Sequence, residues 1–234
     1  MALGYKVSRP SVRRLMRRLG LNPDPLSGKR WSDFLARNAA AIVATDFFTY
    51  EAWTPLGPKS VYALFFIQPD TRRVHLAGVT DHPDEAWMAQ VARNMTMEDE
   101  PFLKNRRFFI ADRDTKFCSS YRSLLAAAGL QTLSLPPRSP NLNAFAERWV
   151  RTIKSECLRG LLLPGPASVT KAIKEYLEHY HRERPHQGLE NKIPFPARAI
   201  ALPQDPSRIQ RKSRLGGLLN TYYWQGQMPL PMAA

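Results

Sequence analysis

The order in which short apolar runs follow one another is the feature that most constrains the fold of this chain. Three such runs, at residues 40–48, 61–67 and 73–79, come in succession with turn residues between them, which predicts three strands. Beyond them, predicted helices and strands alternate: helix 83–97, strand 107–111, helix 121–128, strand 130–135, and helices 143–162 and 169–181. This order indicates an α/β fold with a mixed central sheet of about five strands flanked by helices.

Size and composition favour one main domain. The chain has 234 residues, 44% of them hydrophobic, which is enough for one sizeable core. No run approaches the roughly 18 apolar residues of a membrane span, and residues 1–20 carry arginines where a secretory signal would be apolar. We therefore expect a cytoplasmic protein with no membrane partner. Cys118 and Cys157 are far apart, which favours two inert thiols over a disulfide framework or a thiolate zinc site.

The charge of the chain points to a nucleic-acid partner. The formal net charge is +14, and phosphate polymers are the commonest partners of so basic a chain. Residues 1–38 hold nine Lys/Arg against two Asp/Glu, and residues 198–234 hold five against one, so the middle is nearly balanced. This layout favours a catalytic body between ends that bind nucleic acid, and basic ends that only increase solubility are the alternative.

Residues 12–20 carry the pattern of a short basic helix, with Ser11 as candidate cap and Gly20 as candidate stop. Four apolar residues recur at the spacing of one helical face: Val12, Leu15, Met16 and Leu19. The other face carries four candidate DNA-binding arginines: Arg13, Arg14, Arg17 and Arg18. The segment is similar to the last helix of a helix-turn-helix module whose earlier helices are missing, and an exposed basic surface helix is the alternative.

Three carboxylates occupy positions that are unusual for solvated charges. Asp46 ends the first predicted strand, Asp112 follows the fourth, and Glu147 lies one turn into a helix. A carboxylate at the end of a buried strand must be paired, protonated or bound to a cation. A divalent metal relieves the repulsion between converging carboxylates, and hard oxygen ligands favour Mg²⁺ or Mn²⁺ over zinc. Such ions keep positions open for water and phosphate oxygens, which predicts phosphodiester chemistry.

Each carboxylate also has an alternative interpretation. Asp46 can be a turn former at the end of its strand, and Glu147 an ordinary acid in the first turn of its helix. Asp112 can form an ion pair with Arg113 or Arg138.

Together, the three carboxylates resemble the Asp, Asp, Glu signature of the retroviral-integrase and insertion-sequence transposase superfamily, with 34 residues between the last two. Residues 111–117 resemble the second-strand motif of that family. Residues 140–147 resemble its P-x-x-N-G-x-x-E motif, with alanine in place of glycine at position 144, and residues 184–189 resemble an R-P-H-x-x-L segment. The resemblance runs from about Trp31 to Arg198.

The resemblance implies a ribonuclease-H-like core that cleaves and joins duplex DNA in two steps. Water attacks the phosphodiester at the end of a mobile element, and the freed 3′ hydroxyl then attacks target DNA, without a covalent enzyme intermediate. The implied partners are DNA and further copies of the chain in a homo-oligomer, with no small-molecule substrate. A plain metal-dependent nuclease, a catalytically inactive or truncated DNA-binding remnant and an RNA-directed ribonuclease are the rival interpretations.

Two departures from the family pattern bear on the site. Asp114 stands where the family usually has glycine, so Asp114 is an alternative ligand, although Asp112 directly follows the apolar run. The amino-terminal DNA-reading module is also incomplete. We expect a basic N-terminal helix and linker at residues 1–30, an integrase catalytic core at 31–200 and a tail at 201–234.

Basic residues on the helix of Glu147 are candidates for DNA contact. Arg151 and Lys154 follow Glu147 by four and seven residues, which places them on its helical face, towards phosphate. The resemblance implies this role for Lys154 in particular. An ion pair between Glu147 and Arg151 is the alternative.

Two further clusters are less decisive. His179, His181 and His186 lack cysteines or an acidic pair at ligand spacing, which favours DNA contact or helix packing over a zinc site. Residues 215–224 combine aromatics with nearby basic side chains: Arg208, Arg211, Lys212 and Arg214. An oligomer contact, a DNA-binding arm and a disordered tail are all open for this segment.

Overall fold

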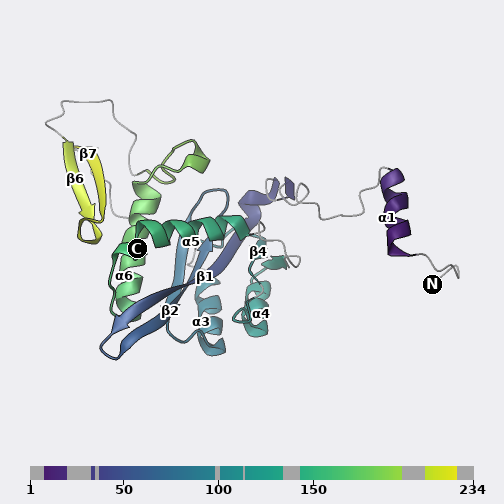
Figure 1. The fold of residues 1–234 in the computed structure, drawn as a ribbon, viewed down its shortest axis with the longest axis horizontal. Coiled ribbons are helices and arrows are strands. Elements are labelled where there is room, and N and C mark those ends of the chain that lie inside the picture. Colours follow the sequence, from purple (N-terminus) through teal and green to yellow (C-terminus); the bar gives the residue numbers. More distant parts are fainter. Residues whose placement is uncertain are drawn as a thin grey trace. The chain divides into compact units, whose positions relative to one another are not determined.

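The computed structural model describes residues 8–19, 33–34, 37–97, 101–112, 114–133, 143–196 and 209–225. The chain divides into two compact units, Met1–Asn38 and Ala39–Ala234. The first contains helix α1 (Arg9–Arg18), and the second contains the sheets and the remaining helices (Figure 1).

Helix α1 begins earlier than the sequence predicts. Ser11 lies inside the helix instead of capping it, and its backbone N–H donates to Ser8 Oγ at 3.3 Å. Arg14 and Arg18 are exposed, as is Leu15 on the apolar face, at 57%. The side chains of Arg13 and Arg17 lie outside the described residues.

A five-stranded sheet forms the centre of the second unit. Its strands are β1 (Ile42–Thr54), β2 (Gly57–Ile67), β3 (Val74–Thr80), β4 (Phe108–Ile110) and β5 (Gln131–Leu133). They lie in the order β3-β2-β1-β4-β5. β1 pairs antiparallel with β2 and β2 with β3, whereas β1 pairs parallel with β4 and β4 with β5. The predicted mixed sheet of about five strands is therefore confirmed.

The first two strands are longer than their apolar runs. β1 and β2 pair without interruption as far as Thr54 opposite Gly57, and Gly57 closes the hairpin at a φ of 108°, a conformation that favours glycine. The prediction that Asp46 ends its strand is therefore wrong, because Asp46 is the fifth residue of a 13-residue strand. Backbone pairing with β2 extends β1 through a polar, mostly solvent-facing stretch.

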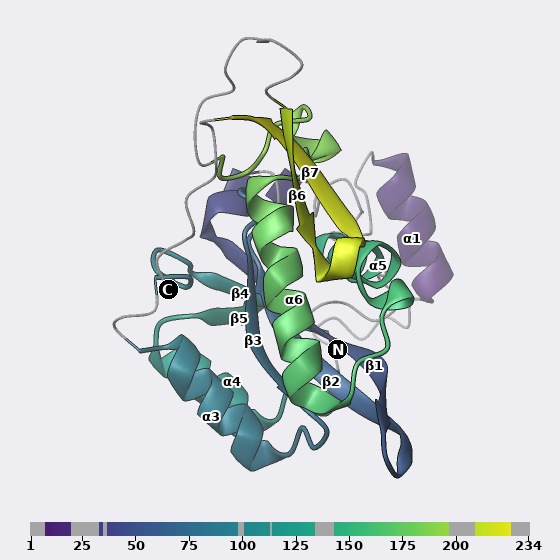
Figure 2. The same ribbon diagram turned by 90° about the vertical axis from the view of Figure 1, so that its left-hand side faces the viewer.

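Helices cover both faces of the sheet. Figure 2 shows α3 (Glu85–Met95) and α4 (Ser119–Ala127) on one side, and α5 (Ala144–Glu156) and α6 (Gly165–Arg182) on the other. Side chains alternate along β2, so Phe66 packs in the core beneath α3 and α4 while Phe65 meets Trp149 of α5. The sheet thus supports two apolar layers, one on each face.

The predicted helices are confirmed in place, but their bounds differ. The helix expected at 143–162 ends at Glu156, and a short 3-10 turn at Leu158–Gly160 follows it. α6 begins four residues earlier than expected, with a proline in its first turn, where a missing N–H breaks no helical hydrogen bond. None of the helices within the described ranges is long and apolar enough to cross a membrane.

A buried histidine joins α6 to the sheet. His181 is 6% exposed, and its Nε2 accepts a hydrogen bond from the backbone N–H of Val74 in β3 at 2.9 Å. Burial lowers the pKa of His181 to about 3, and the charge of Arg73 contributes in the same direction. His181 therefore serves helix packing.

Acidification should weaken this contact. Between the unfolded pKa of 6.5 and the folded value of about 3, only the unfolded chain binds the proton, so the free energy of unfolding falls as the pH falls. We expect His181 to account for a loss of about 1 kcal/mol between pH 7 and pH 5.5 in denaturant titrations. His181→Gln should show a smaller loss, whereas exposed His82→Gln should behave like the wild type. Equal pH dependence in His181→Gln and the wild type would contradict this assignment.

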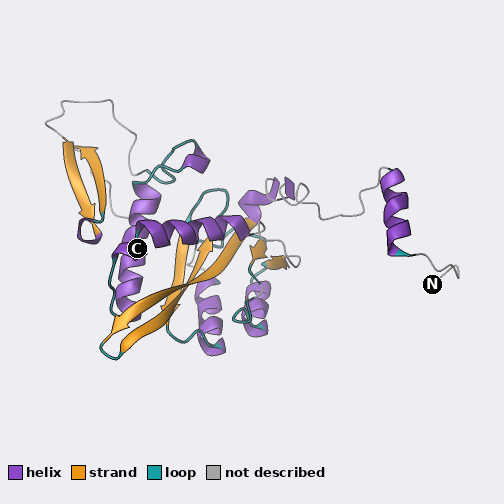
Figure 3. Cartoon of the chain, in the orientation of Figure 1, coloured by secondary structure: helices purple, strands orange, loops and turns teal. Residues whose placement is uncertain are grey.

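The C-terminal segment forms a hairpin that the sequence analysis did not predict. β6 (Ile209–Arg214) and β7 (Leu219–Trp224) pair antiparallel as a separate two-stranded sheet (Figure 3). None of their side chains is buried and they lack a clear apolar alternation, so the sequence carries little strand signal.

Glu183, directly after α6, ties this hairpin to the body. Its buried carboxylate accepts hydrogen bonds from Arg214 Nη2 at 2.8 Å and Thr221 Oγ1 at 2.9 Å, and it lies 3.4 Å from Lys212 Nζ. Burial alone would raise the pKa of Glu183, but these partners and His179 outweigh burial and hold it far below its ordinary range. Two of the four basic residues noted near the tail therefore have a structural partner, while Arg208 lies outside the described residues.

Candidate active site

Asp46 lies on β1, and Asp112 follows the end of the neighbouring strand β4 by two residues. In the parallel pairing of β1 with β4, Ala44 lies opposite Ile110, and each aspartate follows its paired residue by two positions. Neighbouring strands are about 4.8 Å apart. The pairing of β1 with β4 therefore brings the segments that carry the two aspartates close together.

Helix α5 brings Glu147 to the same side of the sheet. Asp46 and Phe48 share one face of β1, because side chains alternate along a strand. Phe48 contacts Trp149 of α5, with the ring centroids 5.7 Å apart. Glu147 lies in the first turn of α5, two residues before that tryptophan.

Asn143 fixes the start of α5 against β1. It occupies the cap position, but its side chain does not cap the helix; its Nδ2 donates to the backbone oxygen of Thr45 at 3.1 Å. Thr45 directly precedes Asp46, so this buried bond connects the segments that carry Asp46 and Glu147. The sequence pattern gave no sign of this bridge.

The electrostatics of Asp46 show that the carboxylates are close enough to act on one another. Burial raises the pKa of Asp46 to about 6, against the effect of a 2.7 Å hydrogen bond that its Oδ1 accepts from Phe47 N–H. The negative charges of Asp112, Glu147 and Asp114 contribute to this increase. Negative charge has thus accumulated around Asp46.

This donor set suits a hard divalent cation. Carboxylate oxygens are the ligands that Mg²⁺ and Mn²⁺ prefer, and a cation would relieve the potential that raises the pKa of Asp46. In the conformation described, no group of three or more His, Cys, Asp or Glu side chains among the described residues is arranged to hold one ion. The three carboxylates are therefore close enough to influence the pKa of Asp46, but they are not arranged to coordinate one ion.

Asp114 has a different environment from Asp112. Its carboxylate accepts hydrogen bonds from the backbone N–H and the Nζ of Lys116, at 2.9 and 2.8 Å. Burial raises the pKa of Asp114, but these bonds and the lysine charge outweigh burial and lower it. Because the carboxylate of Asp114 is already bound to Lys116, Asp112 is the better candidate for a metal ligand. The alternative partners of Asp112, Arg113 and Arg138, lie outside the described residues.

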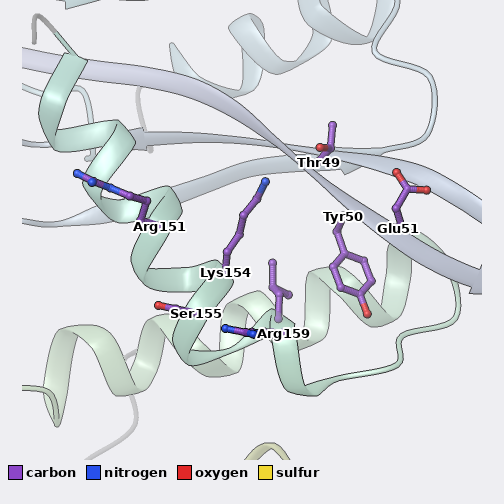
Figure 4. A pocket seen from close by; sticks show the side chains of 8 residues that line it. Thr49, Tyr50, Glu51, Arg151, Lys154, Ser155 and Arg159 are labelled. Carbon is purple, nitrogen blue, oxygen red and sulfur yellow. The ribbon is translucent and has the colours of Figure 1, made fainter. Parts of the chain in front are cut away.

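A basic groove lies along α5 beyond Glu147. It has a volume of about 600 Å³, and Arg151, Lys154 and Arg159 line one side of it, across from Thr49 and Tyr50 of β1 (Figure 4). Arg151 and Lys154 are exposed, as predicted for the face of Glu147.

The alternative ion pair between Glu147 and Arg151 does not form among the described residues. Arg159 is an addition to the predicted basic set. It lies on the 3-10 turn after α5, so the continuous helix predicted to residue 162 could not place it.

The remaining candidate histidines have structural partners. His186 Nε2 is 2.8 Å from the backbone oxygen of Tyr180, and His179 Nδ1 is 3.2 Å from Glu183 Oε2. Both residues therefore contribute to the packing around the end of α6.

The strand order, the mixed pairing and the flanking helices define a ribonuclease-H-like core. Residues 128–194 match the family described as "Integrase core domain". The match is confined to this segment of the chain. It contains Glu147, Arg151 and Lys154, whereas Asp46 and Asp112 lie before it.

Curated relatives of the chain are bacterial transposases. The chain is 32% identical over 73 residues to the putative transposase InsD for insertion element IS2E of Escherichia coli (strain K12), covering 31% of this chain and 34% of that protein. The same identity relates it to transposase InsD for insertion element IS2A/D/F/H/I/K of Escherichia coli, covering 24% of that protein. The match thus spans only about a quarter to a third of these relatives.

Two solved structures have a backbone trace similar to that of this chain. The HTLV-2 integrase catalytic core domain in complex with magnesium has a TM-score of 0.49 at 12% identity, covering 66% of this chain and 93% of that one. The catalytic domain of Mos1 mariner transposase has a TM-score of 0.49 at 14% identity, covering 74% and 83%.

Proposed function

We propose that this chain is the catalytic core of a DNA transposase that cleaves element ends and joins them to target DNA. Asp46, Asp112 and Glu147 would hold Mg²⁺ or Mn²⁺. The observation that carries the proposal is the raised pKa of Asp46, which reflects burial together with the negative charges of the other two carboxylates. A bound cation would relieve this repulsion, and the family match of the segment around Glu147 supports DNA as the substrate.

The residues of the chain supply rigid placement. When bound, the ions would activate the attacking oxygen and stabilise the leaving oxygen of a phosphodiester. The hydrogen bond from Phe47 N–H orients Asp46, and the strand pairing holds Asp112 beside it. Trp149 anchors the helix of Glu147 to the sheet. Groups placed on strands and helices are held more precisely than groups on loops.

The basic residues supply DNA binding in this proposal. Arg151, Lys154 and Arg159 line the groove beside the carboxylates and would contact backbone phosphates. The arginines of α1 would add a second contact, which makes residues 1–30 a DNA-binding arm and 31–200 the catalytic core. Assembly of several copies on two element ends belongs to the same proposal.

The test is an assay of the whole chain with labelled duplex from the ends of its own element, in Mg²⁺ or Mn²⁺. The proposal expects nicked ends followed by joined strands. Hydrolysed ends without joining would instead identify a plain nuclease. Salt-sensitive binding without cleavage would identify a non-catalytic DNA-binding protein, and preference for an RNA–DNA hybrid would identify a ribonuclease.

Asn143→Ala should slow this reaction without unfolding the protein. The bond from Asn143 to Thr45 links the segments of Asp46 and Glu147, so its loss should loosen their spacing. We expect single-turnover cleavage to fall by roughly 10- to 100-fold and stability to fall by about 1 kcal/mol. Asn94→Ala on α3 is the matched control, because Asn94 is exposed and bonds only with Gln90. Full activity of Asn143→Ala would show that the bridge has no positioning role.

A further inference from the structure

A second basic cavity lies on another side of α5. It has a volume of about 230 Å³, and three arginines, Arg72, Arg148 and Arg184, line it together with the aromatic residues Phe145 and Tyr180. We call it the Arg72 pocket. The arginines come from three elements: the turn between β2 and β3, helix α5, and the segment that follows α6.

Arg72 is held in a fixed position without a carboxylate partner. Its Nη1 donates to the backbone oxygen of Pro69 at 2.6 Å, and its guanidinium lies 4.3 Å from the ring centroid of Phe145. Burial lowers the pKa of Arg72, and the charge of Arg148 acts in the same direction, whereas Tyr180 and the carboxylate of Asp70 act in the opposite direction. Among the described residues no ion pair includes Arg72 or Arg148.

Arg184, in contrast, is neutralised. Its Nε and Nη2 donate to both carboxylate oxygens of Glu156, at 2.8 and 2.6 Å. The pocket therefore presents two positive charges that form no ion pair among the described residues, one of them half-buried. A half-buried guanidinium without an anion is unfavourable, and the fork of N–H groups on arginine matches the oxygens of a phosphate.

The segment 184–189, which the sequence analysis matched to R-P-H-x-x-L, forms one wall of this pocket. Arg184, Pro185 and Gln187 line it, and a Cβ on Gly188 would lie 3.2 Å from Arg72 Nη2. Glycine at 188 thus lets this wall approach the guanidinium of Arg72 closely. The segment carries no carboxylate of the candidate active site, so its contribution to the pocket gives it a separate role.

We propose that the Arg72 pocket binds a backbone phosphate of duplex DNA, as a contact separate from the groove of Arg151 and Lys154. The inference rests on the proposed function only in taking DNA as the ligand. Arg148 directly follows Glu147, so the pocket and the carboxylates lie on adjoining faces of α5. A phosphate bound in this pocket would hold the DNA at a point away from the phosphodiester that reacts.

The test is the salt dependence of DNA binding by the full chain, measured in EDTA with duplex DNA. Each lost phosphate contact lowers the slope of log affinity against log salt concentration by about 0.9. Arg72→Gln and Arg148→Gln should each show this decrease, whereas Arg72→Lys, which keeps the charge, should retain most of the slope. Arg93→Gln is the matched control, since Arg93 is exposed on α3 and its guanidinium donates to the side chain of Gln90.

Slopes of Arg72→Gln and Arg148→Gln that equal that of Arg93→Gln would overturn the proposal. If Arg72→Gln fails to fold by thermal melting, Arg148→Gln decides, because Arg148 is exposed. The measurement contains no metal, so it is independent of cleavage. If the wild type binds DNA but does not cleave it, the proposed activity is overturned and the proposal for the Arg72 pocket is unaffected. Absence of salt-sensitive binding in the wild type would overturn both.

Discussion

Asp112→Asn and Glu147→Gln should each abolish metal-dependent cleavage and joining of DNA while the chain still binds DNA. Both substitutions keep the size of the side chain and remove the charge of a proposed ligand near Asp46. Metal ions contribute several kcal/mol to phosphodiester transition states, so we expect losses of at least about 10³-fold in the cleavage rate. Single-turnover nicking in Mg²⁺ and in Mn²⁺, with DNA binding measured in parallel, gives the comparison.

Asp114→Asn is the control that separates the two candidate aspartates. Asp114 is bound by Lys116 through its backbone N–H and its Nζ, so this variant should keep activity within a few fold of the wild type. If Asp114→Asn were inactive and Asp112→Asn active, Asp114 would be the ligand. Activity in Glu147→Gln equal to the wild type would remove Glu147 from the site.

Trp149→Ala should be the most destabilising single substitution on α5. The side chain is 1% exposed, and its ring lies 4.2 Å from that of Phe65 and 5.7 Å from that of Phe48, measured between centroids. Truncation of a buried tryptophan costs about 3–5 kcal/mol, because it removes apolar contacts and leaves a cavity. Denaturant unfolding should show this loss as a lower midpoint at unchanged slope.

Trp53→Ala provides a control of the same residue type. Trp53 lies on the far part of β1 and is 57% exposed, so its loss should change stability by no more than about 0.5 kcal/mol. Equal destabilisation by the two substitutions would show that the contact between α5 and the sheet is not what stabilises this layer. Trp149→Ala should also reduce cleavage at temperatures at which the variant is still folded, because the same contact positions Glu147.

The sequence predicted the sheet and its helices because apolar runs report directly which segments are buried. It misplaced the end of β1, since the strand beyond Phe48 is sustained by backbone pairing with β2 and not by apolar side chains. It also missed the β6–β7 hairpin, whose stability comes from polar contacts with Glu183. Hydrogen bonds between residues distant in sequence leave no periodic signal.

The site was predictable only in part for the same reason. Asp46, Asp112 and Glu147 stood out by their positions beside apolar segments, and their role as ligands stays a prediction. The bridge from Asn143 to Thr45 and the groove position of Arg159 depend on how α5 meets β1. Neither can be read from spacing along the chain.

The parallel pairing of β1 with β4 has a consequence for changes in chain length. Asp46 and Asp112 each follow a paired residue by two positions, so their relative height depends on backbone pairing and not on the residues that connect them. Insertions or deletions in the exposed turn Thr54–Gly57 should leave the two carboxylates aligned. A single-residue deletion between Ala44 and Asp46 would instead turn the carboxylate to the opposite face of the sheet, beneath α3 and α4, where it would meet an apolar core.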